Sequence, residues 1–421
     1  MYTFLFIFLL FFNPVSPSSP DRYFKSLPST LHRRHTFQEY LELTHPEPSD
    51  LLIPSCTLPV LHHSFGNTVN SPPFTVPYSP PSDCPSPWSR VVLDFHASCR
   101  GDQYDRIAAL WLGGAEVLRT STAEPTQTGI FWKVRKDITR YSSLLARSNL
   151  ELTMMLENVV NEVFTGVYHI NVTFFYYDDN TVRVPFSPLD DHKLDTKLGS
   201  EPTGGANMLQ GLWNSYGKPA DVIIPISDDR DKGFWFRIEG KSDVHSKIIR
   251  IPCNTRRAIL ELYVSFHGDD EFWYSNPPDS YIKSNHLPTS RGGGAYREVY
   301  VTIDEEFVAS VVPFPVIFTG GINPLFWEPV VAIGAFNLPS YEFDLSPFLG
   351  NLVDGKNHNF SIGVADSIPF WLVDANLHIW LDHRKSKVKA KSIVIYPTPA
   401  LSGETPFEVQ RPRRVVQDRG K

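Results

Sequence analysis

The feature that most constrains the fold of this chain is a series of short apolar runs, each as long as a strand and each closed by turn residues. In the segment 91–96 the side chains alternate with a period of two, which is the pattern of a half-buried strand. Stretches with a helical period are few and short, for instance 142–146. Further strands are predicted at 107–112, 150–156, 168–177, 222–226, 234–238, 247–251, 258–266, 296–303 and 376–381. The pattern predicts an all-β chain built as a β-sandwich or jelly roll.

With 421 residues, the chain is long enough for two or three domains. A polar segment rich in Gly, Pro and Asp separates two strand-rich blocks, and we interpret it as a linker or insertion. We expect one short helix around 37–43, in a leader that is either trimmed or draped over the body, and loops and edge segments at 51–88. The predicted organisation is a signal peptide (1–19), a leader (20–50), a first jelly-roll domain (51–177), a linker (178–218), a second jelly-roll domain (219–383) and a basic tail that looks like a truncated C-terminal region (384–421).

The N-terminal residues predict entry into the secretory pathway. Residues 1–12 are almost all apolar, too few to span a bilayer, and placed where a secretory signal belongs; an uncleaved anchor is the alternative. Two glycosylation triplets agree with that route, Asn171-Val172-Thr173 and Asn359-Phe360-Ser361. We therefore expect an extracellular or vacuolar protein that makes no stable membrane contact once the signal is cleaved.

Four cysteines limit the covalent framework. An even number in an oxidising compartment suggests disulfides, and four cysteines allow three connectivities. Cys84 and Cys99 are the nearest in sequence and form the expected pair. Because no close Cys or His pair has ligand spacing, the sequence predicts no zinc site.

Composition and missing motifs exclude several functions. The formal net charge of −7 is spread thinly, which argues against nucleic acid as a partner, because such binding needs a basic stripe. The sequence has no Gly-x-Ser-x-Gly elbow, no zincin His-Glu pair and no phosphate-binding Gly-rich loop. Asp228, Asp229 and Asp231 lack the glycine spacing and closing glutamate of a calcium loop, so a solvated turn is favoured. The sequence predicts neither a metal nor an organic cofactor.

Carboxylates at strand ends remain as candidates for chemistry. Asp105 stands before the strand 107–112 and is followed directly by Arg106. Glu157 ends the strand that begins at 150, and Glu271 closes an acidic trio in front of a run of aromatic residues. Paired carboxylates can serve general acid–base chemistry. The alternatives are an ion pair of Asp105 with Arg106, an exposed strand residue at Glu157 and a solvated turn at Glu271.

The segment 91–123 resembles a known family. Its run Asp-Phe-His-Ala-Ser-Cys-Arg-Gly-Asp-Gln-Tyr-Asp-Arg, with the later Trp-Leu-Gly-Gly-Ala-Glu-Val-Leu-Arg-Thr-Ser-Thr, resembles the most characteristic segment of the plant peptide:N-glycanase A family. The run Tyr-Asp-Arg-Ile-Ala also resembles the Trp-Asp-Arg-Tyr-Ala segment of the bacterial peptide:N-glycanase F family, whose principal catalytic Asp falls on Asp105. The sequence around Glu157 is similar to the bacterial Tyr-Thr-Glu-Thr segment that holds a second acid, and Glu271 precedes Phe-Trp much as the third acid precedes Trp. The similarity extends from about 51 to about 383, and family members usually continue with a further β-rich region.

This resemblance implies two adjacent jelly-roll antiparallel β-sandwiches with the site in the cleft between them. It implies Asp105, Glu271 and Glu157 as catalytic acids, with Arg106 positioning a carbonyl or a carboxylate. The implied reaction is hydrolysis of the amide bond between asparagine and the innermost N-acetylglucosamine of N-glycans. N-glycosylated peptides and proteins are the implied partners, and no cofactor is required.

Aromatic side chains near these acids are candidates for stacking on a sugar face. The candidates are Trp111, Trp132 and Trp273. Packing in a hydrophobic core is the alternative for each of them, because large aromatic side chains are usually buried.

Two rival functions stay open at this point. A glycoside hydrolase uses the same kind of paired carboxylates, but it would leave one sugar on the asparagine. A lectin-like module would bind sugars without cutting them, and its acids would be dispensable. An inactive truncated product is a third alternative. The fold alone does not choose among them, so we rely on the residue-level match around Asp105.

Overall fold

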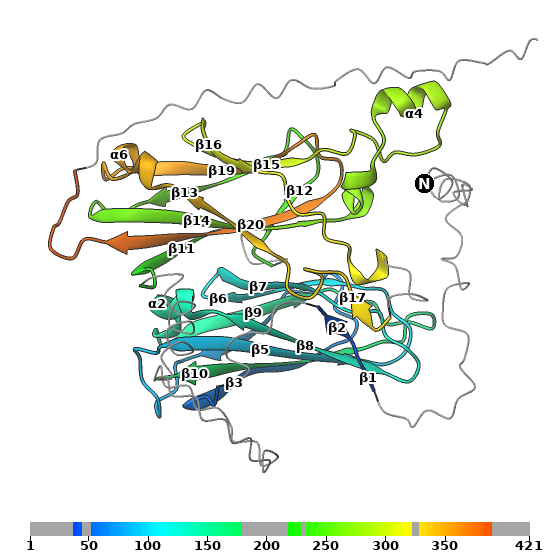
Figure 1. The fold of residues 1–421 in the computed structure, drawn as a ribbon, viewed down its shortest axis with the longest axis horizontal. Coiled ribbons are helices and arrows are strands. Elements are labelled where there is room, and N and C mark those ends of the chain that lie inside the picture. The colour runs from blue at the N-terminus through cyan, green and yellow to red at the C-terminus, as the bar shows by residue number, and fades with distance from the viewer. Residues whose placement is uncertain (1–36, 44–51, 179–217, 229–232, 322–327, 390–421) are drawn as a thin grey trace, which may run out of the picture.

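Figure 1 shows the fold in a computed structural model, which describes residues 37–43, 52–178, 218–228, 233–321 and 328–389. The described residues form β-strands and a few short helices, so the all-β class is confirmed. The helices are η3 (Thr139–Tyr141), α2 (Ser142–Leu145), η4 (Gly268–Asp270), η5 (Trp273–Ser275), α4 (Asp279–Asn285), η6 (Thr319–Gly321), η7 (Ser346–Phe348) and α6 (Leu349–Leu352). The signal peptide, most of the predicted linker and most of the basic tail lie outside the described residues.

The first sandwich consists of two facing sheets. One has the order β1-β8-β5-β10-β3 and the other β4-β9-β6-β7. The strands are β1 (Gln38–Glu39), β3 (Cys56–Phe65), β4 (Phe74–Tyr78), β5 (Arg90–Cys99), β6 (Ile107–Leu112), β7 (Ala115–Ser121), β8 (Ile130–Asp137), β9 (Leu150–Leu156) and β10 (Tyr168–Tyr177). Buried and more exposed side chains alternate along most of β10, because one face of its sheet packs on the core and the other faces outward.

The second sandwich repeats the arrangement. One sheet has the order β11-β20-β14-β18, with β12 also paired to β20, and the other has the order β13-β19-β15-β16. The strands are β11 (Val222–Ile226), β12 (Phe236–Ile238), β13 (Val244–Arg250), β14 (Thr255–Phe266), β15 (Glu298–Ile303), β16 (Glu306–Val311), β18 (Ser340–Asp344), β19 (Asn357–Ala365) and β20 (Trp371–Leu381). In both sandwiches the chain passes repeatedly from one sheet to the other, which is consistent with the predicted jelly roll.

The two sandwiches lie one above the other in Figure 1, with β7 of the first next to β11 and β20 of the second. Trp111 donates from Nε1 to the buried Asp374 carboxylate (2.7 Å), and Arg119 donates from Nη1 to the Leu372 carbonyl (2.5 Å). An apolar cluster fills the space around these bonds: Ala109, Trp111, Met155, Trp235 and Leu372. The buried contact holds the two sandwiches together and brings their loops to a common edge.

The predicted helix around 37–43 is wrong. This stretch forms β1 and β2 (Leu41–Glu42), which pair in parallel with β8 and with β17 (Val330–Val331). An isolated helix this short is unstable in water, and the open strand edges supply backbone partners that are far away in sequence.

The expectation of loops and edge segments at 51–88 is also wrong in part, because β3 and β4 are regular strands. Each contains a proline, Pro59 and Pro77, which hides the strand pattern from a sequence-based prediction. Both strands lie at an edge of their sheet, where a missing N–H is tolerated.

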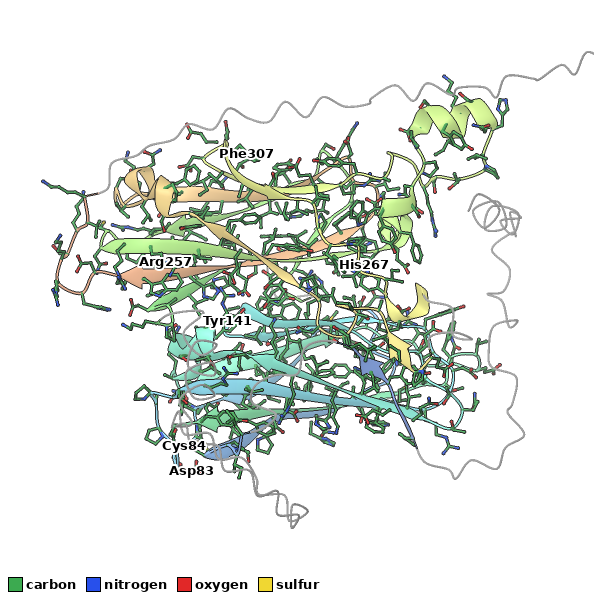
Figure 2. The ribbon with its side chains drawn as sticks, viewed as in Figure 1. Asp83, Cys84, Tyr141, Arg257, His267 and Phe307 are labelled. Atoms are coloured by element: carbon green, nitrogen blue, oxygen red, sulfur yellow. A yellow bond between two sulfur atoms is a disulfide. The ribbon has the colours of Figure 1, made fainter. Side chains whose placement is uncertain are left out.

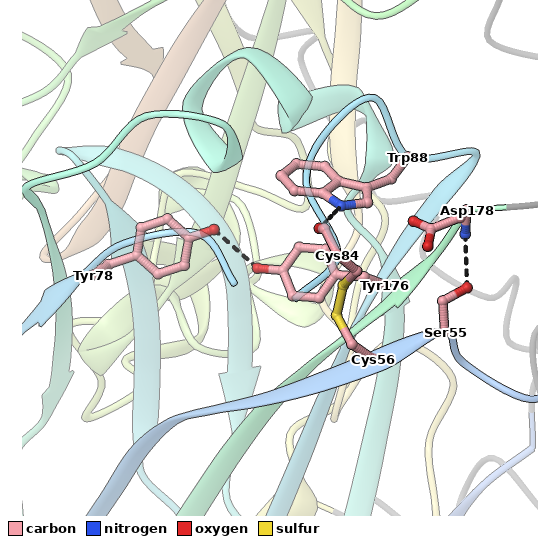
Figure 3. The surroundings of a disulfide bond; sticks show 7 residues. All are labelled: Ser55, Cys56, Tyr78, Cys84, Trp88, Tyr176 and Asp178. Atoms are coloured by element: carbon pink, nitrogen blue, oxygen red, sulfur yellow. Dashed lines mark hydrogen bonds between the residues drawn. A yellow bond between two sulfur atoms is a disulfide. The ribbon is translucent and has the colours of Figure 1, made fainter. Parts of the chain in front are cut away.

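The expected disulfide between Cys84 and Cys99 is corrected by the structure, in which Cys84 is bonded to Cys56 (Figure 3). Cys99 is a free thiol in the core of the first sandwich, and burial raises its pKa to about 12. Trp88 donates from its indole N–H to the Cys84 carbonyl (2.8 Å) beside the disulfide. Cys56, Cys84 and Asp83 also form the one cluster of potential metal ligands among the described residues, and its two sulfurs are in the disulfide.

Surface features bear on the secretory prediction. The side chain of Asn171 is exposed on β10, whereas Asn359 on β19 is half-buried. In the part of the chain that the structure describes, no helix is long and apolar enough to cross a membrane. These findings leave secretion as a prediction.

Candidate functional site

Asp105 lies in the turn directly before β6, and two sets of hydrogen bonds hold this turn. The side chain of Gln103 donates to the Val159 carbonyl (2.8 Å) and accepts from Nη2 of Arg106 (2.7 Å). Arg106 and Thr122 are joined through their backbones, and the Arg106 N–H also donates to the Thr122 hydroxyl (2.8 Å). Asp105 is therefore presented from a turn that is tied to both neighbouring strands, β7 and β9.

A loop of the second sandwich closes onto Asp105. The backbone N–H of Gly320, in η6, donates to Oδ2 of Asp105 (3.2 Å). A Cβ atom on Gly320 would lie only 2.7 Å from Oδ1 of Asp105, so this close approach needs a residue without a side chain. Next to it, the Thr319 hydroxyl donates to the Thr122 carbonyl (2.6 Å). One of the contacts between the two sandwiches is thus made at the candidate catalytic residue itself.

Glu271 approaches the same place from the end of β14, and Asp270 anchors it. Asp270 is fully buried and accepts bonds from Arg297 Nε and Nη2 (2.8 Å each), from Trp371 Nε1 (2.7 Å) and from the Ile368 N–H (2.9 Å). Asp270 is therefore a structural acid, since all these donors stabilise its charge. The anchored turn leaves the next residue, Glu271, half-buried at the edge between the sandwiches.

Asp105 and Glu271 interact electrostatically. Burial and the negative charge of Asp105 raise the pKa of Glu271 to about 7, and Arg291 opposes that rise. Burial also raises the pKa of Asp105, while the Gly320 N–H and the charge of Arg106 oppose it. Two like charges in one site push their pKa values apart. Two acids with different pKa values in one site are suited to taking up and donating a proton.

The hydrogen bond of Glu157 is made outside this pair. It is exposed, one residue beyond the end of β9, and Oε1 accepts from the backbone N–H of Asn70 (3.2 Å). Its neighbour Leu156 is opposite Ala108 in the β6–β9 ladder, so Glu157 lies near the start of β6. The structure brings Asp105 and Glu271 together and gives Glu157 a turn-stabilising bond at the same end of the sheet.

The three tryptophans are buried. Trp111 is bonded to Asp374 in the contact between the sandwiches, Trp132 stacks on Phe336 with ring centroids 5.5 Å apart, and Trp273 packs in the core of the second sandwich. Their exposed fractions are 0%, 0% and 3%, which leaves no ring face open to a sugar. We therefore assign them to packing.

Four residues near the pair were not singled out by the sequence analysis. Gly320 and Arg291 act on Asp105 and Glu271 as described above. Glu124 follows β7, and its Oε1 lies 2.9 Å from the point where a Gly320 Cβ would be. His267 stacks between Phe318 and Phe370, and burial lowers its pKa to about 3, so it stays neutral. No local pattern marks these residues, because the two sandwiches have to pack before they become neighbours.

Comparison with known proteins adds the family. A family model described as Peptide N-acetyl-beta-D-glucosaminyl asparaginase amidase A matches residues 43–398. A curated protein of Prunus dulcis, named Peptide-N4-(N-acetyl-beta-glucosaminyl)asparagine amidase A, is 45% identical over 339 residues, which are 80% of this chain and 56% of that protein. The chain therefore spans about half the length of this curated relative.

Solved structures show more distant likenesses. PNGase F, a glycosylasparaginase from Flavobacterium meningosepticum, is 14% identical with a TM-score of 0.44, over 77% of this chain and 96% of that one. PNGF-II is 11% identical with a TM-score of 0.46, over 78% of this chain and 65% of that one. The extent of the family match and the identity to the Prunus dulcis protein show that this chain belongs to the peptide N-acetyl-beta-D-glucosaminyl asparaginase amidase A family.

Proposed function

We propose that this chain is a glycoamidase, which hydrolyses the amide bond between an asparagine side chain and the innermost N-acetylglucosamine of an N-glycan. The observation that supports it most is the pairing of Asp105 with Glu271, whose pKa is raised to about 7. The Prunus dulcis relative bears the name of an amidase of this kind. The substrates would be N-glycosylated peptides and proteins.

The two acids match the needs of amide hydrolysis. Ionised Asp105 takes a proton from a water molecule while the oxygen of that water bonds to the amide carbon. Protonated Glu271 gives its proton to the amide nitrogen as the carbon–nitrogen bond breaks. The products are a peptide with aspartic acid in place of asparagine and a free glycosylamine. Positioned acids and bases of this kind contribute roughly a hundredfold to ten-thousandfold each.

Arg106 is suited to support the carbonyl oxygen of the substrate. Its Nη2 is used by Gln103, but its Nε is buried and has no hydrogen-bond partner among the described residues. The positive charge of Arg106 acts on Asp105, and it would also favour an oxygen that becomes negative beside that residue in the reaction.

The protein would act in the secretory pathway, in an extracellular or vacuolar compartment. The apolar N-terminal run, the disulfide between Cys56 and Cys84 and the exposed Asn171 triplet support this location. Disulfides persist in oxidising compartments and are rare in the cytosol.

The test is deglycosylation of a defined N-glycopeptide in ¹⁸O-labelled water, followed by mass measurement of the peptide. We expect ¹⁸O-labelled aspartic acid from the wild-type protein and none from Asp105→Asn. Asp102→Asn is the matched control, because Asp102 is in the same turn but binds Gln127 (2.6 Å). A peptide that keeps one N-acetylglucosamine would identify an endoglycosidase instead, and glycan binding without cleavage would identify a lectin.

A further inference from the structure

The chain makes a long excursion between Glu271 and β15, over residues 276–296. The excursion contains α4 and ends in a run of three glycines, Gly292–Gly294, which we call the three-glycine turn. No side chain of α4 is buried, so packing of this helix contributes little to holding the excursion in place. The bonds at the end of the excursion, next to β15, are therefore important for its position.

Arg297 holds the three-glycine turn. It directly precedes β15 and is fully buried. Its Nη1 donates to the carbonyls of Gly293 (3.3 Å), Gly294 (3.0 Å) and Tyr296 (2.7 Å), and its Nη2 donates to the carbonyl of Gly292 (3.1 Å). Every carbonyl of the three-glycine turn thus accepts a bond from one guanidinium. A Cβ on Gly293 would lie 3.1 Å from Nη2, so the turn wraps closely around this group.

The same guanidinium holds Asp270 on its other side. Nε donates to Oδ2 and Nη2 donates to Oδ1, both at 2.8 Å, which is the bidentate geometry of a guanidinium on a carboxylate. Both side chains are fully buried, so each charge depends on the other. A lysine could not replace this fork, because its ammonium group is a single point of charge without the planar geometry.

The other donors to Asp270 are neutral. They are the indole of Trp371, the backbone N–H of Ile368 and the side-chain amide of Asn276. Among the residues that the structure describes, Arg297 alone brings a positive charge into contact with this carboxylate. A buried carboxylate that loses its cation has to take up water or a proton, so the turn around Asp270 should loosen when Arg297 is changed.

Both contacts of Arg297 lie one residue away from a group that acts in the candidate active site. Asp270 directly precedes Glu271. Gly292 directly follows Arg291, whose charge acts on Glu271. Arg297 therefore joins the backbone next to the acid to the backbone next to the charge that opposes it.

Further bonds of these two segments are weaker. The Glu271 N–H donates to the Gly268 carbonyl over a long distance, 3.4 Å. The Ser290 hydroxyl donates to Oδ2 of Asp269 (3.2 Å) and links the two segments directly, but Ser290 is exposed, so water competes for this bond. The buried, charged contact of Arg297 should therefore dominate.

We propose that Arg297 is a positioning residue of the active site, which clamps the turn of Glu271 and the three-glycine turn together. It acts through Asp270 and Gly292 and does not touch the reacting atoms. The consequence for catalysis rests on the proposed glycoamidase function, whereas the consequence for the two turns does not.

The principal test compares Arg297→Lys with Arg256→Lys. Both substitutions keep a positive charge, but Arg256 is exposed. We expect kcat/KM to fall on the order of 10- to 100-fold in Arg297→Lys, since a displacement of about 1 Å can cost that much, and to stay within about twofold in Arg256→Lys.

The pH–rate profile gives a readout that lost stability alone would not move. The limb that belongs to Glu271 should move below pH 7 in Arg297→Lys only, because water that enters the loosened turn reduces the burial that raises the pKa of Glu271. Burial influences this pKa more than Arg291 does, so the net shift is downward even if Arg291 also moves.

Hydrogen exchange and a carbon-13 titration of the Glu271 carboxyl need no activity. In the full chain, the amides of 270–272 and 292–296 should exchange faster in Arg297→Lys than in the wild type, and at the wild-type rate in Arg256→Lys. The titration should show the same downward shift of the Glu271 pKa as the pH–rate profile.

Gly293→Ala and Gly294→Ala form a second pair, which tests the same contact if Arg297→Lys fails to fold. Both glycines have a left-handed φ, 78° and 74°, so alanine strains the backbone similarly at both positions. The new Cβ would crowd Nη2 of Arg297 only at position 293, since nothing lies within 4 Å of it at position 294. We expect faster exchange at 270–272 in Gly293→Ala and not in Gly294→Ala.

The outcomes separate the two proposals. If the wild-type protein does not release glycans, the glycoamidase proposal fails, and exchange and titration still decide the role of Arg297. If Arg297→Lys and Gly293→Ala both keep the wild-type exchange at 270–272 and the wild-type pKa of Glu271, the positioning role is wrong. If Arg256→Lys or Gly294→Ala reproduces the effects, their cause is not the contact of Arg297, and the positioning role is again wrong.

Discussion

Two glutamates of the same region show how differently this fold uses its acids. Glu261 lies within β14, and Glu271 follows soon after the end of that strand. Burial alone would raise the pKa of Glu261, but the hydrogen bond from His378 and the charge of Arg140 hold it well below its usual range. Burial and the charge of Asp105 raise the pKa of Glu271 to about 7. Burial acts in the same direction on both, so the sign of the neighbouring charges decides the outcome.

The two sites also occupy different ends of the contact between the sandwiches. Tyr141, which donates to Glu261, and His267, which stacks on Phe318, are labelled at opposite sides of the contact in Figure 2. The Glu261 end has a donor for each oxygen: His378 (2.9 Å) and Ser340 (2.9 Å) are two of them. At the Asp105 end, the negative charge of Asp105 acts on a second carboxylate, Glu271, and raises its pKa. We infer that the first end fastens the sandwiches together and that the second is free to do chemistry.

The largest effect is expected when Glu271 is made neutral. Glu271→Gln should lower kcat/KM by about 100- to 10,000-fold, because the glutamine amide is far too weak an acid to protonate the leaving nitrogen. Initial rates on a fluorescent N-glycopeptide would measure it. Asp269→Asn, in the same acidic turn, is the control and should stay near the wild-type rate. Full activity in Glu271→Gln would show that Glu271 has no chemical role, so that it would no longer differ from Glu261 in this respect.

The next largest effect concerns stability. Glu261→Gln removes the buried carboxylate to which His378, Tyr141 and Arg140 donate. Breaking such a buried charged network should lower the free energy of unfolding by about 3 to 5 kcal/mol. The control is Glu342→Gln, because Glu342 also bonds to Arg140 but its side chain is 41% exposed, and it should cost less than about 1 kcal/mol. Urea denaturation gives both values. Equal losses of unfolding free energy in the two variants would show that burial does not make Glu261 a more important partner of Arg140 than Glu342.

Gly320→Ala should disturb the site without disturbing the fold. The new Cβ would lie 2.7 Å from Asp105 and 2.9 Å from Glu124, so both carboxylates have to move. The φ angle of Gly320 is not in the left-handed region, which makes alanine acceptable to the backbone. We expect kcat/KM to fall by about 10- to 100-fold with little change in thermal stability. Gly66→Ala, where a Cβ meets nothing within 4 Å, should change neither quantity.

The raised pKa of Glu271 predicts a pH-dependent loss of stability. The folded-state pKa is about 7, and the unfolded value is near about 4.3. Between these values the folded state binds the extra proton, so stability is fully present below the lower value and is lost as pH rises through the upper one. Ionisation of Glu271 should therefore lower the free energy of unfolding by about 1 to 2 kcal/mol by pH 8, after allowance for solvent screening. The difference in unfolding free energy between wild type and Glu271→Gln, measured at pH 4 and pH 8, tests it; a constant difference contradicts it.

Arg291 should give the smallest effect. It is exposed, and its charge opposes the rise in the pKa of Glu271. Arg291→Gln should therefore move the pH–rate profile slightly upward and change kcat/KM by no more than about twofold. The shift should vanish in about 1 M salt, where charges are screened within about 3 Å. Arg256→Gln, also exposed, is the control, and a large or salt-independent change would mean that Arg291 contacts the substrate directly.

The strands that could be predicted from the sequence are those whose pattern is local. β10 alternates along most of its length because one face is outside, and its predicted range coincides with the observed Tyr168–Tyr177. β3 and the stretch 37–43 were missed for different reasons. Pro59 obscures the strand pattern of β3, whereas β1 and β2 form only because β8 and β17 offer them free edges. A strand that depends on such distant partners has no signature of its own.

For the candidate site, the sequence by itself determined that Asp105 precedes a strand and that Glu271 follows one, and the family resemblance singled both out. Only the tertiary structure decided that the charge of Asp105 acts on Glu271, that the Gly320 N–H bonds to Asp105 and that Glu124 lies beside Gly320. It also decided that Cys84 bonds to Cys56, and that the three tryptophans are interior. The physical reason is the same in every case: pKa values, disulfide partners and exposed ring faces depend on distance and burial. Distance and burial exist only once the two sandwiches have packed.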